Sequence, residues 1–250
     1  MWSTSIVPGI APGSYVMACD YWEEGTRLTA RVPVNVGNAD VDGVVIHLEP
    51  AFQLTGSVRL ESSKNSALPK PPWPLSLRSQ DPNGGGAAIT WIPDHLSFTV
   101  REAPAGTYKL EGNPPAPFYV KSALSDGHDL TREAVPISRS GGRIDVVVSD
   151  ESGSLEGTVA DADGQPVGGA SILAIQEGRV TVNSATTPDG RFRLNGLPPG
   201  EYTVTAWNDS RSVEYADPDW MNQHARAEKA SVAAGQTATV KLVEQIIQPQ

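Results

Sequence analysis

The chain has 250 residues, and its 29 acidic residues against 19 basic ones leave a formal net charge of −10. This balance argues against a nucleic-acid partner, because the phosphates of nucleic acids require a basic surface. The 24 glycines and 21 prolines favour a turn-rich all-β fold over a helical one. Cys19 is the single cysteine, so no intrachain disulfide can form, and no run of 18 apolar residues predicts insertion into a membrane.

The first predicted element in the chain, a proline–glycine turn followed by a strand, recurs twice more. The glycines of the three turns are Gly13, Gly106 and Gly200, which stand 93 and 94 residues apart. In PPGEY, Pro199 and Gly200 predict a type II turn, and the strand after it alternates apolar and polar side chains. Such a repeat indicates one structural unit that is used three times.

A second landmark, LTGSV from Leu54 and LEGTV from Leu155, alternates with the turns and sets the boundaries of the units. A last strand also recurs, and we expect it over residues 41–50, 142–151 and 236–245. The predicted units are the C-terminal half of a β-sandwich over residues 1–50 and two further sandwiches over residues 51–150 and 151–246.

Each complete unit is predicted to hold about seven short strands with turn signals roughly every 8 to 12 residues. This is the pattern of an antiparallel, Ig-like or prealbumin-like β-sandwich, so we predict a tandem all-β fold. One short helix is expected near residues 217–229, because Asp217 suits the N-cap and Pro218 suits the first helical position.

The third unit resembles a known family. Its segments GSLEGTVADADGQPVGGASILAI and TTPDGRFRLNGLPPGEYTVTAW resemble the carboxypeptidase regulatory-like domain, and they are also similar to the B-type repeats of bacterial surface adhesins. The resemblance is strong over residues 154–208, weaker over the second unit and partial in the first. It implies a prealbumin-like sandwich of the kind found in tandem in many exported bacterial proteins, and it implies little about activity.

The front half of the first unit is missing from the sequence. In the third unit 43 residues separate Gly157 from the turn at Gly200, whereas the first turn already lies at Gly13. Three interpretations stay open: the chain is part of a longer protein, residues 1–50 pack on the second unit, or another chain donates strands. The N-terminus has no signal-peptide pattern, so we expect any export signal to lie outside this chain.

No residue pattern predicts catalysis, a metal site or a cofactor. None of the four histidines, His47, His95, His128 and His224, stands in a zinc-binding motif. We interpret DGHD at residues 126–129 as a polar turn and DADG at residues 161–164 as a hairpin turn rather than a calcium loop. Cys19 is interpreted as a structural thiol.

The remaining candidates for binding are the tryptophans Trp73, Trp91, Trp207 and Trp220. Exposed rings at the ends of a sandwich could stack on sugars, and the alternative is that the rings plug the edges of each unit. We therefore predict a non-catalytic structural or interaction module of an exported or cell-surface bacterial protein, located outside the cytoplasm. The alternatives are a carbohydrate-binding module with a polysaccharide ligand, and a subunit that self-associates through its N-terminal half-unit in a strand-exchanged fibre.

Overall fold

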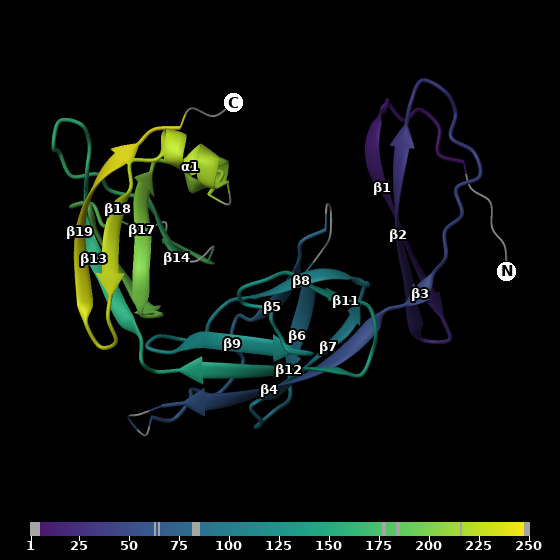
Figure 1. Ribbon diagram of the computed structural model, residues 1–250, viewed down its shortest axis with the longest axis horizontal. Helices are drawn as coiled ribbons and strands as arrows, with labels where there is room; N and C mark the ends of the chain where they lie inside the picture. Colours follow the sequence, from purple (N-terminus) through teal and green to yellow (C-terminus); the bar gives the residue numbers. More distant parts are fainter. Residues whose placement is uncertain are drawn as a thin grey trace.

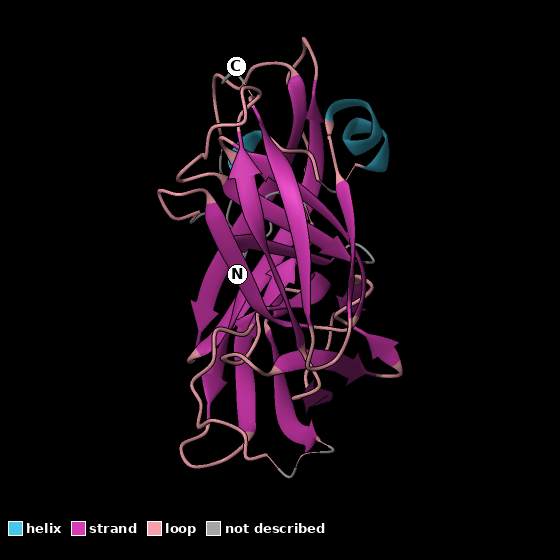
Figure 2. Ribbon diagram, turned by 90° about the vertical axis from the view of Figure 1, so that its left-hand side faces the viewer, coloured by secondary structure: helices cyan, strands magenta, loops and turns pink. Residues whose placement is uncertain are grey.

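The computed structural model describes residues 6–62, 64, 66–81, 86–176, 179–183, 186–215 and 217–247. Three β-sheets follow one another along the chain, with three, nine and seven strands (Figure 1). Strands make up almost all of the regular structure, and the helical part is small (Figure 2). The predicted all-β fold class is confirmed. In the described part of the chain, no helix is long and apolar enough to cross a membrane.

The first sheet is a long hairpin with a short third strand. β1 (Gly13–Glu23) pairs with β2 (Thr26–Val36) over their whole length, and β2 also pairs with β3 (Glu49–Pro50). The strand predicted over residues 41–50 forms only as β3, so most of that prediction is wrong. The physical reason is that residues 41–48 have no neighbouring strand in the described structure, and a strand needs a partner for its backbone groups.

The second sheet folds over into a sandwich. Its strands are β4 (Phe52–Glu61), β5 (Ser76–Ser79), β6 (Ala87–Trp91), β7 (Ser97–Ala103), β8 (Gly106–Glu111), β9 (Tyr119–Ser125), β10 (His128–Asp129), β11 (Val135–Ile137) and β12 (Gly142–Ser149). β6 pairs with β7 of one layer and with β5 of the other, so it joins the two layers. Between the layers lies a core of aromatic and branched side chains that includes Phe52, Phe98 and Tyr108.

The third sheet forms a second sandwich with its own core. Its strands are β13 (Gly153–Ala160), β14 (Ser171–Gln176), β15 (Arg179–Asn183), β16 (Arg191–Leu197), β17 (Gly200–Trp207), β18 (Glu228–Val232) and β19 (Thr237–Gln245). In both sandwiches the first strand pairs in parallel with the last, β4 with β12 and β13 with β19. The shared pairing shows that the two units have the same topology at their termini.

The predicted helix is present but short. A 3-10 turn at Ser210–Ser212 precedes α1 (Pro218–His224), and the Asp217 side chain accepts hydrogen bonds from the backbone nitrogens of Asp219 and Trp220 at 2.9 and 3.1 Å. The N-cap prediction is confirmed. The helix ends five residues before the predicted boundary because the chain must reach β18, which pairs with β17.

The three repeated turns share one hydrogen bond. In each unit the tyrosine two residues after the turn glycine donates its hydroxyl hydrogen to the carbonyl oxygen four residues earlier. The pairs are Tyr15 to Ala11 at 2.9 Å, Tyr108 to Pro104 at 2.7 Å and Tyr202 to Pro198 at 2.8 Å. This corner fixes the path of the chain into β1, β8 and β17, and it shows that these strands are counterparts.

The predicted type II turn is not formed at Gly200. Its φ is +146°, far from the value of about +80° that this turn requires. The residue instead opens β17 and pairs with Val232. The tyrosine hydrogen bond, rather than a particular turn type, is therefore what the three phrases have in common.

Candidate functional site

A groove on the second unit is lined by Trp91, one of the predicted site residues. It measures about 710 Å³ and lies between the proline-rich loop over residues 68–72 and the segment over residues 89–96. Pro69, Pro71 and Pro72 come from one wall, and Ile92 and the other apolar side chains from the facing one. The walls are apolar, which suits a ligand with a flat or hydrophobic face.

Trp91 lines this groove, and its ring is held by aromatic neighbours. Its ring lies edge-on to Trp73 and to Phe98, with centroid distances of 5.0 and 5.4 Å. The indole nitrogen donates a hydrogen bond to the carbonyl oxygen of Trp73 at 3.2 Å. The ring is half-buried, so one part packs on the core while another part lines the groove. Its orientation is thus set before any ligand arrives.

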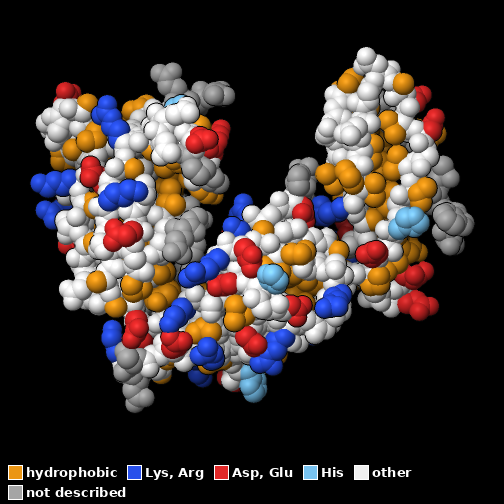
Figure 3. Space-filling view, in the orientation of Figure 1, with side chains coloured by type: hydrophobic (Ala, Val, Ile, Leu, Met, Phe, Trp, Pro, Cys, Tyr) orange, Lys and Arg blue, Asp and Glu red, His pale blue; other side chains and the backbone are white. Residues whose placement is uncertain are grey.

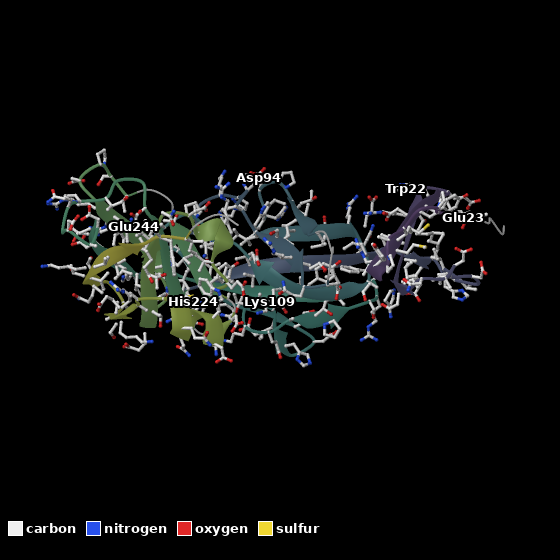
Figure 4. All side chains as sticks on the ribbon, turned by 90° about the horizontal axis from the view of Figure 1, so that it is seen from above. Trp22, Glu23, Asp94, Lys109, His224 and Glu244 are labelled. Atoms are coloured by element: carbon white, nitrogen blue, oxygen red, sulfur yellow. The ribbon has the colours of Figure 1, made fainter. Side chains whose placement is uncertain are left out.

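Charged side chains stand at the rim of the groove. The Lys70 ammonium lies 3.9 Å from the Asp94 carboxylate, and both side chains are exposed. Asp94 lies in the middle of the molecule in Figure 4, between the first and third units. The backbone nitrogen of His95 donates to the carbonyl oxygen of Ile92 at 3.2 Å, which closes the turn beside the groove. Exposed ion pairs of this kind contribute little stability, so these side chains can rearrange around a ligand.

The structure separates the four predicted tryptophans into two groups. Trp73 and Trp207 are buried, so neither ring offers a face to a sugar, and these two leave the set of candidates. Trp220 is half-buried on α1, tilted against Trp207 at 5.8 Å and stacked on His224 at 4.7 Å. Trp91 combines partial exposure with a place in the lining of the groove.

In the turns at residues 126–129 and 161–164, aspartate side chains accept hydrogen bonds from backbone nitrogens. Asp161 accepts hydrogen bonds from the backbone nitrogens of Asp163 and Gln165 at 2.9 and 2.8 Å. Asp129 accepts from the backbone nitrogens of Ala123 and Thr131 at 3.0 Å each. Among the residues that the structure describes, no three His, Cys, Asp or Glu side chains gather as a metal site would require.

A second hollow was not foreseen from the sequence. It measures about 260 Å³ and lies between residues 29–32 of β2 and the segment that contains Val45, His47 and Glu49. Pro104 and Ala105 of the second unit also line it. The only sequence signal for it was the incomplete first unit, which implied an uncovered face without showing where a hollow would form.

A polar cluster lies where the second unit meets the third. Asp150 is buried, and its Oδ2 accepts a hydrogen bond from the Ser62 hydroxyl at 2.5 Å. This bond, with a second from the Ser66 hydroxyl, keeps the pKa of Asp150 below its usual value. The other carboxylate oxygen, Oδ1, has no hydrogen-bond partner within the described structure.

Comparison with known proteins gives one family match, and it lies within the third unit. Residues 154–243 match the family model of the carboxypeptidase regulatory-like domain. No curated protein matches the chain with significance.

Several solved structures are similar at low identity. A streptococcal ancillary pilin is 15% identical, with 96% of this chain and 77% of that chain covered and a TM-score of 0.26. The minor pilin of Streptococcus agalactiae is 14% identical, with 80% and 98% covered and a TM-score of 0.28. A shaft pilin of Lactobacillus rhamnosus GG is 13% identical, with 80% and 100% covered and a TM-score of 0.28.

The matched residues begin in β13 and end in β19, so they span the third sheet. The sandwich of β13 to β19 thus matches the carboxypeptidase regulatory-like domain, in agreement with the resemblance of residues 154–208.

Proposed function

We propose that the chain is a non-catalytic structural and interaction module of an exported or cell-surface bacterial protein. In this role, two firmly joined sandwiches act as a spacer and hold the N-terminal sheet and the exposed loops toward a partner. The observation that carries the proposal is the junction between the second and third units, which is short, buried and hydrogen-bonded on both sides.

The junction consists of three residues between the end of β12 and the start of β13. Asp150 and Ser152 are buried there, and Asp150 is bound to Ser62 of the second unit. Ser152 donates its hydroxyl to the carbonyl oxygen of Pro117, and its own carbonyl accepts from the nitrogen of Gly235 in the third unit at 2.8 Å. A connection held from both sides resists bending, because bending would break these bonds in a partly dry site.

The first sheet is also tied to the second unit. The backbone nitrogen of Ala51 donates to the carbonyl oxygen of Arg27 at 2.8 Å. The Arg27 guanidinium donates to the carbonyl oxygen of Glu102 at 2.9 Å and pairs with Asp20 at 2.7 Å. These bonds support a defined position for the hairpin at one end of the spacer.

A location outside the cytoplasm is part of the proposal. It is supported by the carboxypeptidase regulatory-like domain at residues 154–243, since the resemblance points to tandem units in exported bacterial proteins. A module of this kind meets its partner on the cell surface or in the surrounding medium.

The spacer role can be tested by measuring the distance between two spin labels. The labels would replace Leu124 and Glu228, both exposed, in a Cys19→Ser background. We expect a narrow distance distribution, and a matched variant with a Gly-Ser insertion after Glu151 should broaden it. If the unmodified junction already gives a distribution as broad as the insertion variant, the spacer role is wrong.

A second candidate function is carbohydrate binding, and the observation that favours it is the half-exposed Trp91 ring in an apolar groove. Retention of the full chain on insoluble polysaccharides, lost in Trp91→Ala, would support this function. Lys70→Ala is the matched control: it changes an exposed side chain at the rim of the groove and leaves the Trp91 ring in place. No retention on any polysaccharide tested would remove the candidate.

A further inference from the structure

The hollow of about 260 Å³ lies where the first sheet meets the second unit. β2 forms one wall of it, side chains within residues 45–49 form a second, and Pro104 and Ala105 between β7 and β8 form the third. Figure 3 shows histidine, acidic and basic side chains close together in this region, with hydrophobic ones beside them. The hollow is slightly smaller than a typical drug-sized site of about 300–1,000 Å³, so it suits a small molecule.

The polar side chains of the hollow come from neighbouring positions of β2 and β3. Thr29 of β2 pairs directly with Glu49 of β3, so their side chains share one face of the sheet. Arg31 belongs to the same face, because alternate residues of a strand point to the same side. All three line the hollow, and His47 lines it beside them. The hollow therefore gathers a hydroxyl, a guanidinium, a carboxylate and an imidazole.

Three of these four side chains have no partner within the described part of the chain. Thr29 is only 6% exposed, yet its hydroxyl forms no hydrogen bond with any described residue. The Glu49 carboxylate and the His47 imidazole likewise form neither an ion pair nor a hydrogen bond there. A buried hydroxyl without a partner in the protein is satisfied by a bound molecule, either water or a ligand.

Opposite charges line the hollow without closing on each other. Arg31 and Glu49 are diagonal neighbours across the β2–β3 pair, which places their Cβ atoms about 7 Å apart. They do not neutralise each other directly, because the Glu49 carboxylate has no ion-pair partner among the described residues. A ligand with an anionic and a cationic group side by side can pair with both. A free α-amino acid has this arrangement, because its carboxylate and its ammonium group are attached to the same carbon.

The remaining lining selects the body of the ligand. Val32, Val45, Pro104 and Ala105 contribute apolar surface to the hollow. An aliphatic side chain loses water favourably against such a surface, whereas a charged side chain would find no partner there. A segment inside a peptide carries neither terminal charge, and the end of a peptide carries one. The pair of charges therefore favours the free amino acid over a peptide.

We propose that the hollow binds a free α-amino acid with an aliphatic side chain. Arg31 pairs with the carboxylate of the ligand, Glu49 pairs with its ammonium group, and the Thr29 hydroxyl donates a hydrogen bond to a carboxylate oxygen. The aliphatic side chain packs against Val45 and Pro104. The ligand contacts both the first sheet and the second unit, so its binding also strengthens the connection between them. This function is separate from the spacer role, which depends on the junction after β12.

The test is isothermal titration calorimetry of the full chain with the probes L-valine and L-leucine. We expect saturable binding with a dissociation constant at or below about 1 mM. Two derivatives each lack one charge: N-acetyl-leucine has no ammonium group, and leucine amide has no carboxylate. Each should bind about tenfold more weakly or worse than leucine, because one charge-assisted hydrogen bond is lost. Absence of binding by both amino acids up to about 10 mM, or equal affinity for leucine and its derivatives, would overturn the proposal.

Variants of the chain assign each charge of the ligand to its side chain. Arg31→Gln should weaken the binding of leucine about tenfold or more and leave that of leucine amide unchanged, since the amide has no carboxylate to lose. Glu49→Gln should weaken leucine equally and leave N-acetyl-leucine unchanged. Glu23→Gln is the matched control, because it removes an exposed carboxylate of the same sheet outside the hollow.

Retained binding of the matching derivative shows that the hollow of each variant is still formed. The proposal is wrong if the control weakens leucine as much as Glu49→Gln does, or if the two hollow variants leave the affinity for leucine unchanged. The spin labels at Leu124 and Glu228 lie outside the hollow, so this test and that of the spacer role can fail independently.

Discussion

The tyrosine corners allow one hydrogen bond to be removed at three equivalent positions that differ in burial. We consider Tyr15→Phe, Tyr108→Phe and Tyr202→Phe, each of which deletes a hydroxyl and leaves the ring in place. At Tyr108 and Tyr202 the bond is short, 2.7 and 2.8 Å, and the ring is buried. At Tyr15 the bond is 2.9 Å long, but water reaches the residue.

The expected magnitudes follow from what replaces the lost bond. A buried hydrogen bond contributes about 1 kcal/mol net, and its loss leaves a carbonyl oxygen with poorer solvation, so Tyr108→Phe and Tyr202→Phe should each lower the free energy of unfolding by about 1 to 1.5 kcal/mol. For a domain of this size that corresponds to a fall in melting temperature of roughly 4 to 8 °C. Tyr15→Phe should change the free energy of unfolding by less than about 0.5 kcal/mol, because water can replace the lost donor.

Differential scanning calorimetry of the full chain can check this, since the two sandwiches have separate cores. Tyr108→Phe should move the transition of the second unit and Tyr202→Phe that of the third. If both buried variants melt at the wild-type temperatures, or if Tyr15→Phe is as damaging as they are, the corner does not stabilise the units as argued.

Two further predictions concern close packing and ionisation. Gly56→Ala should destabilise the second unit by about 1 to 3 kcal/mol in urea unfolding, because the added Cβ would overlap the Phe98 ring. Gly37→Ala is the control, since an added Cβ there meets no atom within 4 Å and should not change the stability; equal effects of the two substitutions would contradict the argument. Hydrogen bonds from Arg211 lower the pKa of Asp209 from 3.8 to about 2. The stabilisation from this pair is therefore complete above about pH 4 and lost as the pH falls toward 2. NMR titration should show the pKa returning toward 3.8 in Arg211→Gln, and an unchanged value would refute the pairing.

Much of the fold could be predicted because turn chemistry and alternation are local signals. The strands that begin at Gly106 and Gly200 and the helix start at Asp217 depend on residues that are neighbours in sequence, so the sequence specifies them, although the turn type expected at Gly200 did not form. The segment over residues 41–48 shows the limit of that reasoning. It alternates as a strand should, but pairing depends on a partner strand, and the alternation of one segment does not show whether a partner is present.

The candidate site was less predictable for the same reason. Trp73 and Trp91 are both near loop-forming residues, and the sequence treats them alike. In the structure Trp73 is buried against Trp91, and the loop over residues 68–72 faces β6 and residues 92–96 across the groove. Which ring is inside depends on this long-range contact, and no local pattern encodes it.

The parallel pairing of the first and last strands determines how each sandwich responds to a pulling force. The chain enters the second unit at the start of β4 and leaves at the end of β12, so tension applied through its ends drives these two neighbours past each other. All the backbone hydrogen bonds between these two strands are then loaded together instead of breaking one after another. The same geometry holds for β13 and β19, so each of the two sandwiches is expected to resist rupture when force is applied along the chain.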